Sequence, residues 1–278
     1  MKKWILSTGL MLVTWSVTAS YFPFELTYGS WQQGSIVAVK IHAAQQVLVD
    51  DKPLMIDHQG NSLFGIGRDA TIVTLRWQDE KGEWFNGQQR VAQRSYDIQH
   101  INGLPNNKVN PNPQELAEIQ ANNRLVAQTR AKPTMSLMPE FPFLWPSSGR
   151  ISGVYGSQRI LNGEPRRPHF GVDIAAPEGT PILAPSDGQV VLAHANMVLT
   201  GQTIMMDHGL GLMSIFVHLS DISVSPGEYV KRGQLIGKVG KTGRATGPHL
   251  HWGVTWRDVQ IDAAKLVATP VPPSLLIQ

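Results

Sequence analysis

The chain of 278 residues is long enough for two modest domains, and its 42% hydrophobic and 16% charged residues exclude a disordered or fibrous protein. The formal net charge is only +3, and 22 basic residues stand against 21 acidic ones once Lys2 and Lys3 are set aside, which excludes a nucleic-acid partner that requires a strong basic excess. Cysteine is absent, so disulfides, thiolate nucleophiles and thiolate metal ligands are excluded, and any metal must bind to His, Asp or Glu.

Residues 1–19 have the pattern of an export signal. Lys2 and Lys3 give a positive start, residues 4–17 are mostly apolar, and residues 17–19 form a small-residue cleavage site. The apolar run is short and interrupted by Ser and Thr, so a cleaved signal peptide is favoured over the alternative, an uncleaved membrane anchor. No later stretch of the sequence is apolar enough to span a membrane. We therefore expect an exported protein with no integral membrane span after signal cleavage.

Short β-type runs broken by turn residues fill residues 24–103. In residues 72–77, Val73, Leu75 and Trp77 alternate with polar neighbours, as a half-buried strand requires. Further strands are expected at residues 35–42, 46–49, 54–56 and 90–101. This succession of short strands predicts a small, immunoglobulin-like β-sandwich domain over residues 20–104. The histidines of this part are scattered and predict no site.

Residues 105–146 are expected to form a linker that contains one helix, over residues 112–131. Asn112 is a good N-cap, Pro113 suits the first helical position, and Glu115 completes a capping box. Apolar residues follow at helical spacing, and Pro133 ends the pattern. The helical positions that define the stripe are Leu116, Ile119, Asn123 and Val126. Residues 135–146, with four prolines among aromatic residues, predict an extended connector.

The last part of the chain, residues 147–278, has regularly placed glycines and short strand-like runs. Strands are expected at residues 189–194, 203–207, 213–218, 235–239 and 249–255, with one short helix near residues 262–267. These features predict a compact antiparallel β domain.

Two histidines in this domain, His249 and His251, are spaced for a shared site. Side chains two apart on a strand point to the same face, so both imidazoles would converge while Leu250 faces into packing. Alone the pair is a weak signal, because most strand histidines are solvated or structural. Residues 240–248 contain three glycines and a proline, which suits backbone that lies close to a substrate.

A second group is formed by His169 and Asp173, an imidazole and a carboxylate of the types that Zn²⁺ accepts. Four extended residues would separate them too far for a shared ion, so Gly171 must permit a bend or His169 must lie in the loop. Two nitrogens and one oxygen, with a fourth position open to water, would be a catalytic zinc pattern. His218 ends an apolar strand and by itself carries little weight.

Three segments together resemble the lysostaphin-type, or LytM-like, zinc endopeptidases over about residues 149–254. They are HFGVDIAAPEGTPILAPSDGQV, IFVHLSD and PGEYVKRGQLIGKVGKTGRATGPHLHWGV. Carried over by motif, the resemblance implies that His169, Asp173 and His251 bind zinc. It implies that His218 and His249 are the two active-site histidines that are not ligands. Phe216 stands where the family often has Tyr, which we interpret as a packing variation.

The resemblance implies a zinc endopeptidase that cuts peptide cross-links in peptidoglycan, with one Zn²⁺ per chain. We expect D-alanyl–diaminopimelate bonds in stem peptides to be the substrate, in the periplasm of a Gram-negative bacterium. Zinc would polarise the peptide carbonyl and acidify a bound water, while His218 and His249 would orient that water, move its proton and stabilise the oxyanion.

Two other functions remain alternatives. Some LytM-like domains have lost zinc ligands and act as non-catalytic activators of cell-wall amidases, but all five positions are filled here. A secreted protease that degrades proteins is the other alternative, although such family members usually carry disulfides. For the residues before the peptidase domain we expect either restraint of the enzyme or docking onto an envelope regulatory protein.

Overall fold

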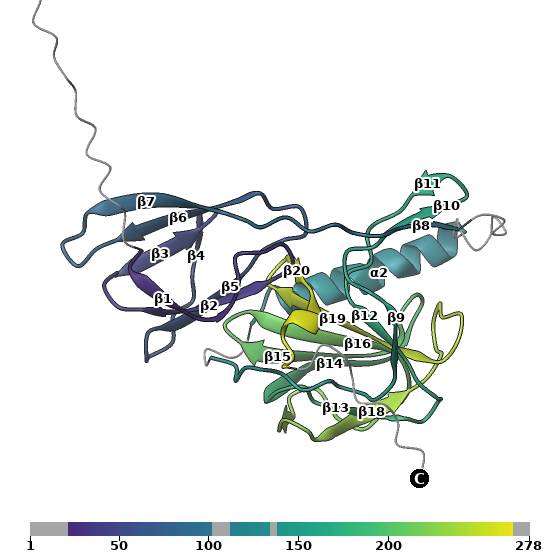
Figure 1. The fold of residues 1–278 in the computed structure, drawn as a ribbon. Helices are drawn as coiled ribbons and strands as arrows, with labels where there is room; N and C mark the ends of the chain where they lie inside the picture. Colours follow the sequence, from purple (N-terminus) through teal and green to yellow (C-terminus); the bar gives the residue numbers. More distant parts are fainter. Residues whose placement is uncertain (1–21, 102–111, 134–137, 269–278) are drawn as a thin grey trace, which may run out of the picture.

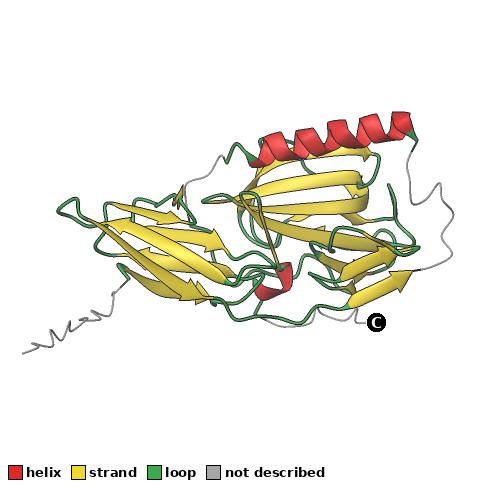
Figure 2. Cartoon of the chain, turned by 90° about the horizontal axis from the view of Figure 1, so that it is seen from above, coloured by secondary structure: helices red, strands yellow, loops and turns green. Residues whose placement is uncertain are grey.

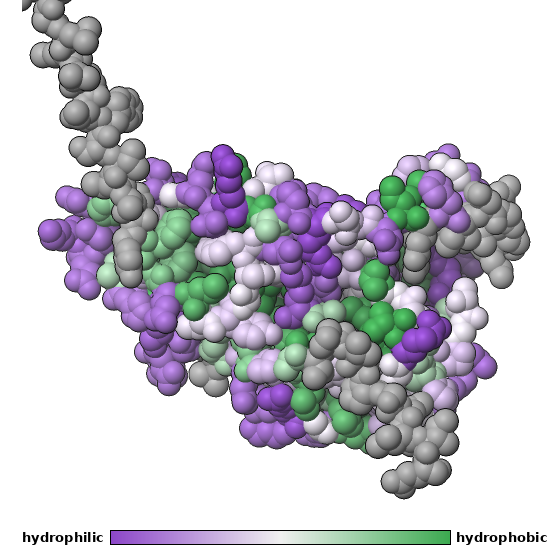
Figure 3. All heavy atoms as spheres, viewed as in Figure 1, coloured by the Kyte–Doolittle hydropathy of each residue, from purple (hydrophilic) through white to green (hydrophobic). Residues whose placement is uncertain are grey.

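The computed structural model describes residues 22–101, 112–133 and 138–268 as two lobes lying side by side (Figure 1). The expected signal peptide at residues 1–19 lies outside the described residues. Apart from a single-turn 3-10 element, helix occurs in the described part only as α2 (Pro113–Arg130), so the prediction of a mainly β protein is confirmed. Within the described residues, no helix combines the length and apolarity that a membrane crossing requires. In Figure 3, hydrophobic surface on the viewed face is broken into separate areas by hydrophilic side chains.

The N-terminal lobe contains two antiparallel sheets, with strand orders β1-β2-β5 and β4-β3-β6-β7. Their bounds are β1 (Phe24–Gly29), β2 (Ile36–Ile41), β3 (Gln46–Val49), β4 (Lys52–Pro53), β5 (Asn61–Gly65), β6 (Ile72–Gln78) and β7 (Trp84–Arg90). Val73, Leu75 and Trp77 are buried along β6, as their alternation predicted. The immunoglobulin-like topology and the domain boundaries remain predictions.

The expected strand over residues 90–101 is wrong. Only β8 (Ile98–Ile101) forms within it, and this strand pairs in parallel with β10 (Gln158–Leu161), which also carries β11 (Glu164–Pro165). Tyr96 packs edge-on against Tyr155 at 6.3 Å between ring centroids. This segment therefore leaves the first lobe by way of Tyr96, which packs on the second lobe, and by way of β8, which pairs with β10.

Helix α2 begins and ends almost where the sequence predicted. Asn112 caps it, and the capping box with Glu115 is present in both directions. Its apolar stripe is narrower than predicted, since Ile119 is buried but Leu116 is 45% exposed. Figure 2 shows the helix lying over one face of the large sheet. There Leu125 and Val126 pack against a cluster on three adjacent strands, made of Leu192, Met197, Met205 and Met213.

The C-terminal lobe is built on one large antiparallel sheet with the order β17-β14-β15-β16-β19-β12-β9, to which β13, β18 and β20 attach. The bounds are β9 (Arg150–Gly153), β12 (Val172–Ala175), β13 (Pro181–Leu183), β14 (Gly188–Met197), β15 (Gly201–Gly209), β16 (Leu212–Ile222), β17 (Tyr229–Val230), β18 (Leu235–Val239), β19 (His249–Trp256) and β20 (Val259–Ile261). A short 3-10 helix, η1 (Ala263–Lys265), follows. All five predicted strands are present, most of them a few residues longer than expected.

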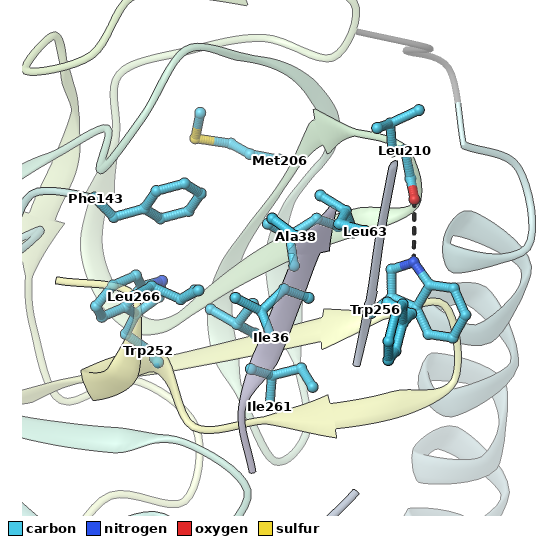
Figure 4. Packing of buried hydrophobic residues seen from close by; sticks show 14 of the residues in the cluster. Ile36, Ala38, Leu63, Phe143, Met206, Leu210, Trp252, Trp256, Ile261 and Leu266 are labelled. Atoms are coloured by element: carbon cyan, nitrogen blue, oxygen red, sulfur yellow. Dashed lines mark hydrogen bonds between the residues drawn. The ribbon is translucent and has the colours of Figure 1, made fainter. Parts of the chain in front are cut away.

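A single hydrophobic cluster extends through both lobes (Figure 4). Ile36 of β2 lies beside Ile261 and Leu266 of the second lobe, and β2 is buried on both faces. Polar contacts reinforce this junction, among them a 2.8 Å ion pair between Arg94 and the largely buried Asp262. The first lobe is thus anchored at the Trp256 end of β19, seven residues or roughly 23 Å along the strand from His249.

Candidate metal centre

Three side chains with ligand-type atoms converge beside β12. Asp173 and His251 lie opposite each other because β12 and β19 pair with these residues in register. His169 precedes β12. The distances are 3.0 Å from His169 Nε2 to Asp173 Oδ1, 3.0 Å from His169 Nε2 to His251 Nδ1, and 2.7 Å from His251 Nδ1 to Asp173 Oδ1. The structure therefore brings the three predicted metal ligands together, as a group able to hold a metal ion.

His169 reaches this group from the loop before β12, one of the two arrangements that the sequence allowed. Gly171 serves close packing, because a Cβ atom there would lie 2.5 Å from Cε1 and 2.6 Å from Nε2 of His251. The same Cβ atom would lie 2.8 Å from the backbone oxygen of Trp252. Gly153 has a similar role, since its Cβ would lie 2.3 Å from Asp173 Oδ2. Two glycines thus leave the space in which the ligand side chains sit.

The protonation of the group suits a cation. Burial raises the pKa of Asp173, but hydrogen bonds with His169 and His251 outweigh it and hold that pKa far below its usual range. Burial lowers the pKa of His251. His169 Nδ1 lies 3.0 Å from the Val154 carbonyl, and if it donates its proton there in a metal-loaded site, Nε2 is left with a lone pair for the ion in place of a hydrogen bond to Asp173. Lone pairs that converge without enough protons between them are stabilised by a metal ion.

The spacing also fits zinc. Ligand atoms about 2.0–2.2 Å from one tetrahedral Zn²⁺ lie ~3.3–3.6 Å apart, so the observed 2.7–3.0 Å requires only a small expansion. Two neutral imidazoles and one carboxylate are a donor set that zinc accepts. The residues present therefore fit the implied metal.

His218 and His249 lie next to the metal group, with 4.7 Å between their ring centroids. Each is held at Nδ1 by a backbone carbonyl: Thr242 at 2.8 Å for His218 and Gly247 at 2.9 Å for His249. Nε2 is then the ring nitrogen of each that has no hydrogen bond within the described chain. Burial, with a smaller contribution from the charge of His249, lowers the pKa of His218 to about 4. His218 is therefore a neutral base at pH 7.

The backbone at His218 is unusual. Its φ is +67°, in the left-handed region, where histidine is among the residues found more often than most. At this residue β16 changes partners, from β19 at Val217 to β18 at Leu219. The amide of His218 donates to the Thr200 carbonyl at 2.8 Å. Sequence reasoning expected an ordinary strand end here and missed this bulge.

Thr242 is a supporting residue that the sequence did not reveal. Besides its carbonyl contact with His218, its Oγ1 donates to the Leu219 carbonyl at 2.7 Å and accepts from the Gln202 amide at 3.0 Å. Gly243 packs tightly here, since a Cβ would lie 2.4 Å from the Gly201 nitrogen. The glycine-rich stretch was expected to lie close to a substrate, but Gly240 and Gly243 instead pack against protein backbone, and only Gly247 lines open space.

The five histidine and aspartate side chains line an open groove of about 530 Å³. The other lining residues are Ser152, Ala175, Leu199, Thr200, Val217, Arg244, Thr246, Gly247 and Pro248. Within the part of the chain that the structure describes, no lining residue precedes Ser152. Arg244 is the one positively charged side chain among the lining residues.

Two further aromatic side chains of this lobe, Trp252 and His208, are structural. Trp252 is fully buried, donates to Ser214 Oγ at 3.2 Å and packs edge-on against Trp145, so it is not available to stack on a sugar. His208 is buried and bonded to the Asp187 carbonyl and to Ser214. Burial lowers the pKa of His208 to about 4.

Comparison with known proteins agrees with this geometry. Residues 167–263 match the model of peptidase family M23. Peptidoglycan DD-endopeptidase ShyA of Vibrio cholerae is 39% identical over 136 residues, which cover 48% of this chain and 31% of ShyA. Peptidoglycan DD-endopeptidase ShyB of the same species is 39% identical over 108 residues, covering 39% of this chain and 25% of ShyB. The matched stretches therefore span a third or less of these relatives.

A solved structure matches most of the chain. It is a Pseudomonas aeruginosa protein assigned to peptidase M23, with 27% identity and a TM-score of 0.67, over 86% of this chain and 95% of that one. The predicted LytM-like resemblance is confirmed: the C-terminal part of this chain is a peptidase family M23 domain.

Proposed function

We propose that this protein is a zinc endopeptidase that hydrolyses peptide cross-links in peptidoglycan, at D-alanyl–diaminopimelate bonds. The observation that carries the proposal is the convergence of His169 Nε2, Asp173 Oδ1 and His251 Nδ1 in an open groove with two more histidines beside them. Purely structural zinc sites are closed, whereas catalytic ones keep a position open.

His169, Asp173 and His251 would hold the ion. Bound there, zinc would polarise the scissile carbonyl and lower the pKa of water. The second hydrogen bond of His169, to the Val154 carbonyl, fixes its tautomer and keeps Nε2 available. Asp173 supplies the one negative charge, so the loaded site would keep a net positive charge.

His218 and His249 would handle the proton. With Nδ1 of each ring donating to a carbonyl, Nε2 is the atom that can accept a proton and later return it to the leaving amine. The rings lie close enough that two positive charges would repel, so one proton at a time is expected. A protonated ring would also stabilise the developing oxyanion. Which histidine takes which part stays open.

The substrate class is supported by the named activity of ShyA and ShyB and by Arg244. Diaminopimelate carries a free carboxyl group that a guanidinium can bind, whereas a glycine bridge carries none. The filled ligand positions disfavour a non-catalytic amidase activator. Export to the periplasm, and an envelope regulatory protein as partner, belong to the same proposal.

The test combines metal analysis with digestion of purified sacculi. The full chain should hold one zinc and convert cross-linked dimers to monomers, leaving glycan strands intact. His169→Ala and His251→Ala should lose both metal and activity. His218→Ala and His249→Ala should keep zinc and lose ~10²- to 10⁴-fold in turnover. His58→Ala, an exposed histidine of the first lobe, is the control. Full zinc occupancy in His169→Ala, or new sugar reducing ends, would refute the proposal.

A further inference from the structure

A second cavity, of about 520 Å³, lies away from the groove, where the two lobes and helix α2 meet. Its walls include Arg130 at the end of α2, Arg167 in the loop before His169, and Arg257 in the turn between β19 and β20. Met55 of the first lobe and Asp258 complete this side. Three arginines therefore line one cavity.

Arg130 is the most deeply placed of the three. Its Nε atom is buried and has no hydrogen-bond partner in the described chain. Burial lowers the pKa of Arg130, and the charge of Arg167 lowers it further. No ion pair joins Arg130 or Arg167 to an acidic group among the described residues. Two cations thus lie near each other without a compensating carboxylate.

The contacts of Arg257 bring no negative charge into the cavity, and the carboxylate of Asp258 does not neutralise the three arginines. Arg257 donates to the Pro53 carbonyl at 2.7 Å and lies 4.8 Å from the Trp256 ring centroid. Asp258 is 3.0 Å from Lys52, and its side chain is 73% exposed. Burial lowers the pKa of Arg257, and the charge of Asp258 partly offsets that effect. Lys52 and Arg257 share this one carboxylate, so against three arginines the cavity keeps a surplus of positive charge.

Burying a charge without a partner is costly, and a cluster of like charges adds to that cost. An anion that enters the cavity would remove both penalties. A guanidinium binds carboxylate or phosphate oxygens through paired N–H groups, and three of them match a dianion better than a single carboxylate. We propose that the Arg130–Arg167–Arg257 cavity is a binding site for a phosphate group.

A phosphate bound there would join parts of the molecule that are far apart in sequence. Arg130 belongs to α2, Arg167 precedes the metal ligand His169 by two residues, and Arg257 contacts Pro53 of the first lobe. The ligand would therefore stabilise the junction of helix, peptidase lobe and N-terminal lobe, independently of catalysis.

The test is binding of inorganic phosphate and of glycerol 3-phosphate to the zinc-loaded full chain, by calorimetry and thermal unfolding. Both probes should raise the unfolding temperature if the phosphate group alone is recognised. A preference for glycerol 3-phosphate would identify a phosphate monoester as the source. Arg167→Gln and Arg130→Gln should weaken binding at least roughly tenfold, while Arg76→Gln, an exposed arginine of the first lobe, should not.

A second readout separates this site from the metal centre, which can also attract phosphate. His169→Ala should retain the arginine-dependent binding. Without phosphate, Arg130→Gln should be at least as stable as the parent protein, because it removes an uncompensated buried charge. Absence of binding, or binding lost in His169→Ala and kept in Arg167→Gln, would overturn the proposal.

Discussion

Replacing Gly171 with Ala is a sensitive test of how the metal centre is assembled, because it alters no ligand. The added Cβ would lie 2.5 Å from His251 Cε1, whereas carbon atoms pack at about 3.5–4.0 Å. A shift of the glycine backbone alone cannot accommodate the new Cβ, because that atom would also lie 2.8 Å from the backbone oxygen of Trp252 on β19. His251 must therefore move by about 1 Å.

A displacement of that size separates His251 Nδ1 from Asp173 Oδ1, now 2.7 Å apart. Loss of ligand support typically costs 10- to 100-fold in metal affinity, and overpacking costs about 1–3 kcal/mol of stability. We expect Gly171→Ala to bind zinc ~10- to 100-fold more weakly in competition with a chelator. Gly67→Ala, whose Cβ would meet its neighbour at an ordinary 3.8 Å, is the control. Equal zinc affinity in the two variants would refute the reasoning.

Three further changes test other parts of the structure. His208 has a folded pKa of about 4, below its ordinary 6.5, so His208 alone should account for about 3 kcal/mol of the stability that the metal-free protein loses as the pH falls from 6.5 through 4. Arg244→Gln should raise KM roughly fivefold for dimers with a free diaminopimelate carboxyl group. Asn122→Ala should lower kcat/KM several-fold, because Asn122 Oδ1 accepts the Val198 amide at 3.1 Å and so holds the turn that carries the groove wall.

Each of these three predictions has a matched control. Denaturant titrations of His208→Gln should show a weaker pH dependence, and an unchanged slope would count against burial of His208 as its cause. Dimers with an amidated carboxyl group should show no KM difference between Arg244→Gln and the parent, and a difference there would dismiss carboxylate recognition. Gln120→Ala, exposed on the same helix and without a side-chain hydrogen bond in the described chain, should behave as the parent.

Strand periodicity predicted the part of the site that depends on it. His249 and His251 share a face with Leu250 fully buried between them, as two-residue alternation requires. Capping chemistry likewise located α2, since Asn112, Pro113 and Glu115 act within one turn. These features are local in the chain, and local features are what a sequence expresses directly.

The parts of the site that the sequence did not predict depend on pairing between segments that are distant in the chain. The meeting of Asp173 with His251 follows from the register of β12 on β19, which periodicity alone does not specify. The left-handed backbone of His218 arises where β16 passes from β19 to β18. The support from Thr242 likewise requires two loops to pack. The run at residues 90–101 was misassigned because its end pairs with β10, some sixty residues later in the chain, and Tyr96 packs against Tyr155.

The position of helix α2 bears on whether the residues before the peptidase lobe restrain it. The described residues before the peptidase lobe do not cover the groove, because all described lining residues lie between Ser152 and His251. The helix instead contacts the far side of the wall, where a small cavity with Ile119 is also lined by Leu199 and Thr200. Thr200 in turn accepts the His218 amide. If the helix supports this wall, Asn122→Ala lowers kcat/KM; if it restrains the enzyme, the same change raises it.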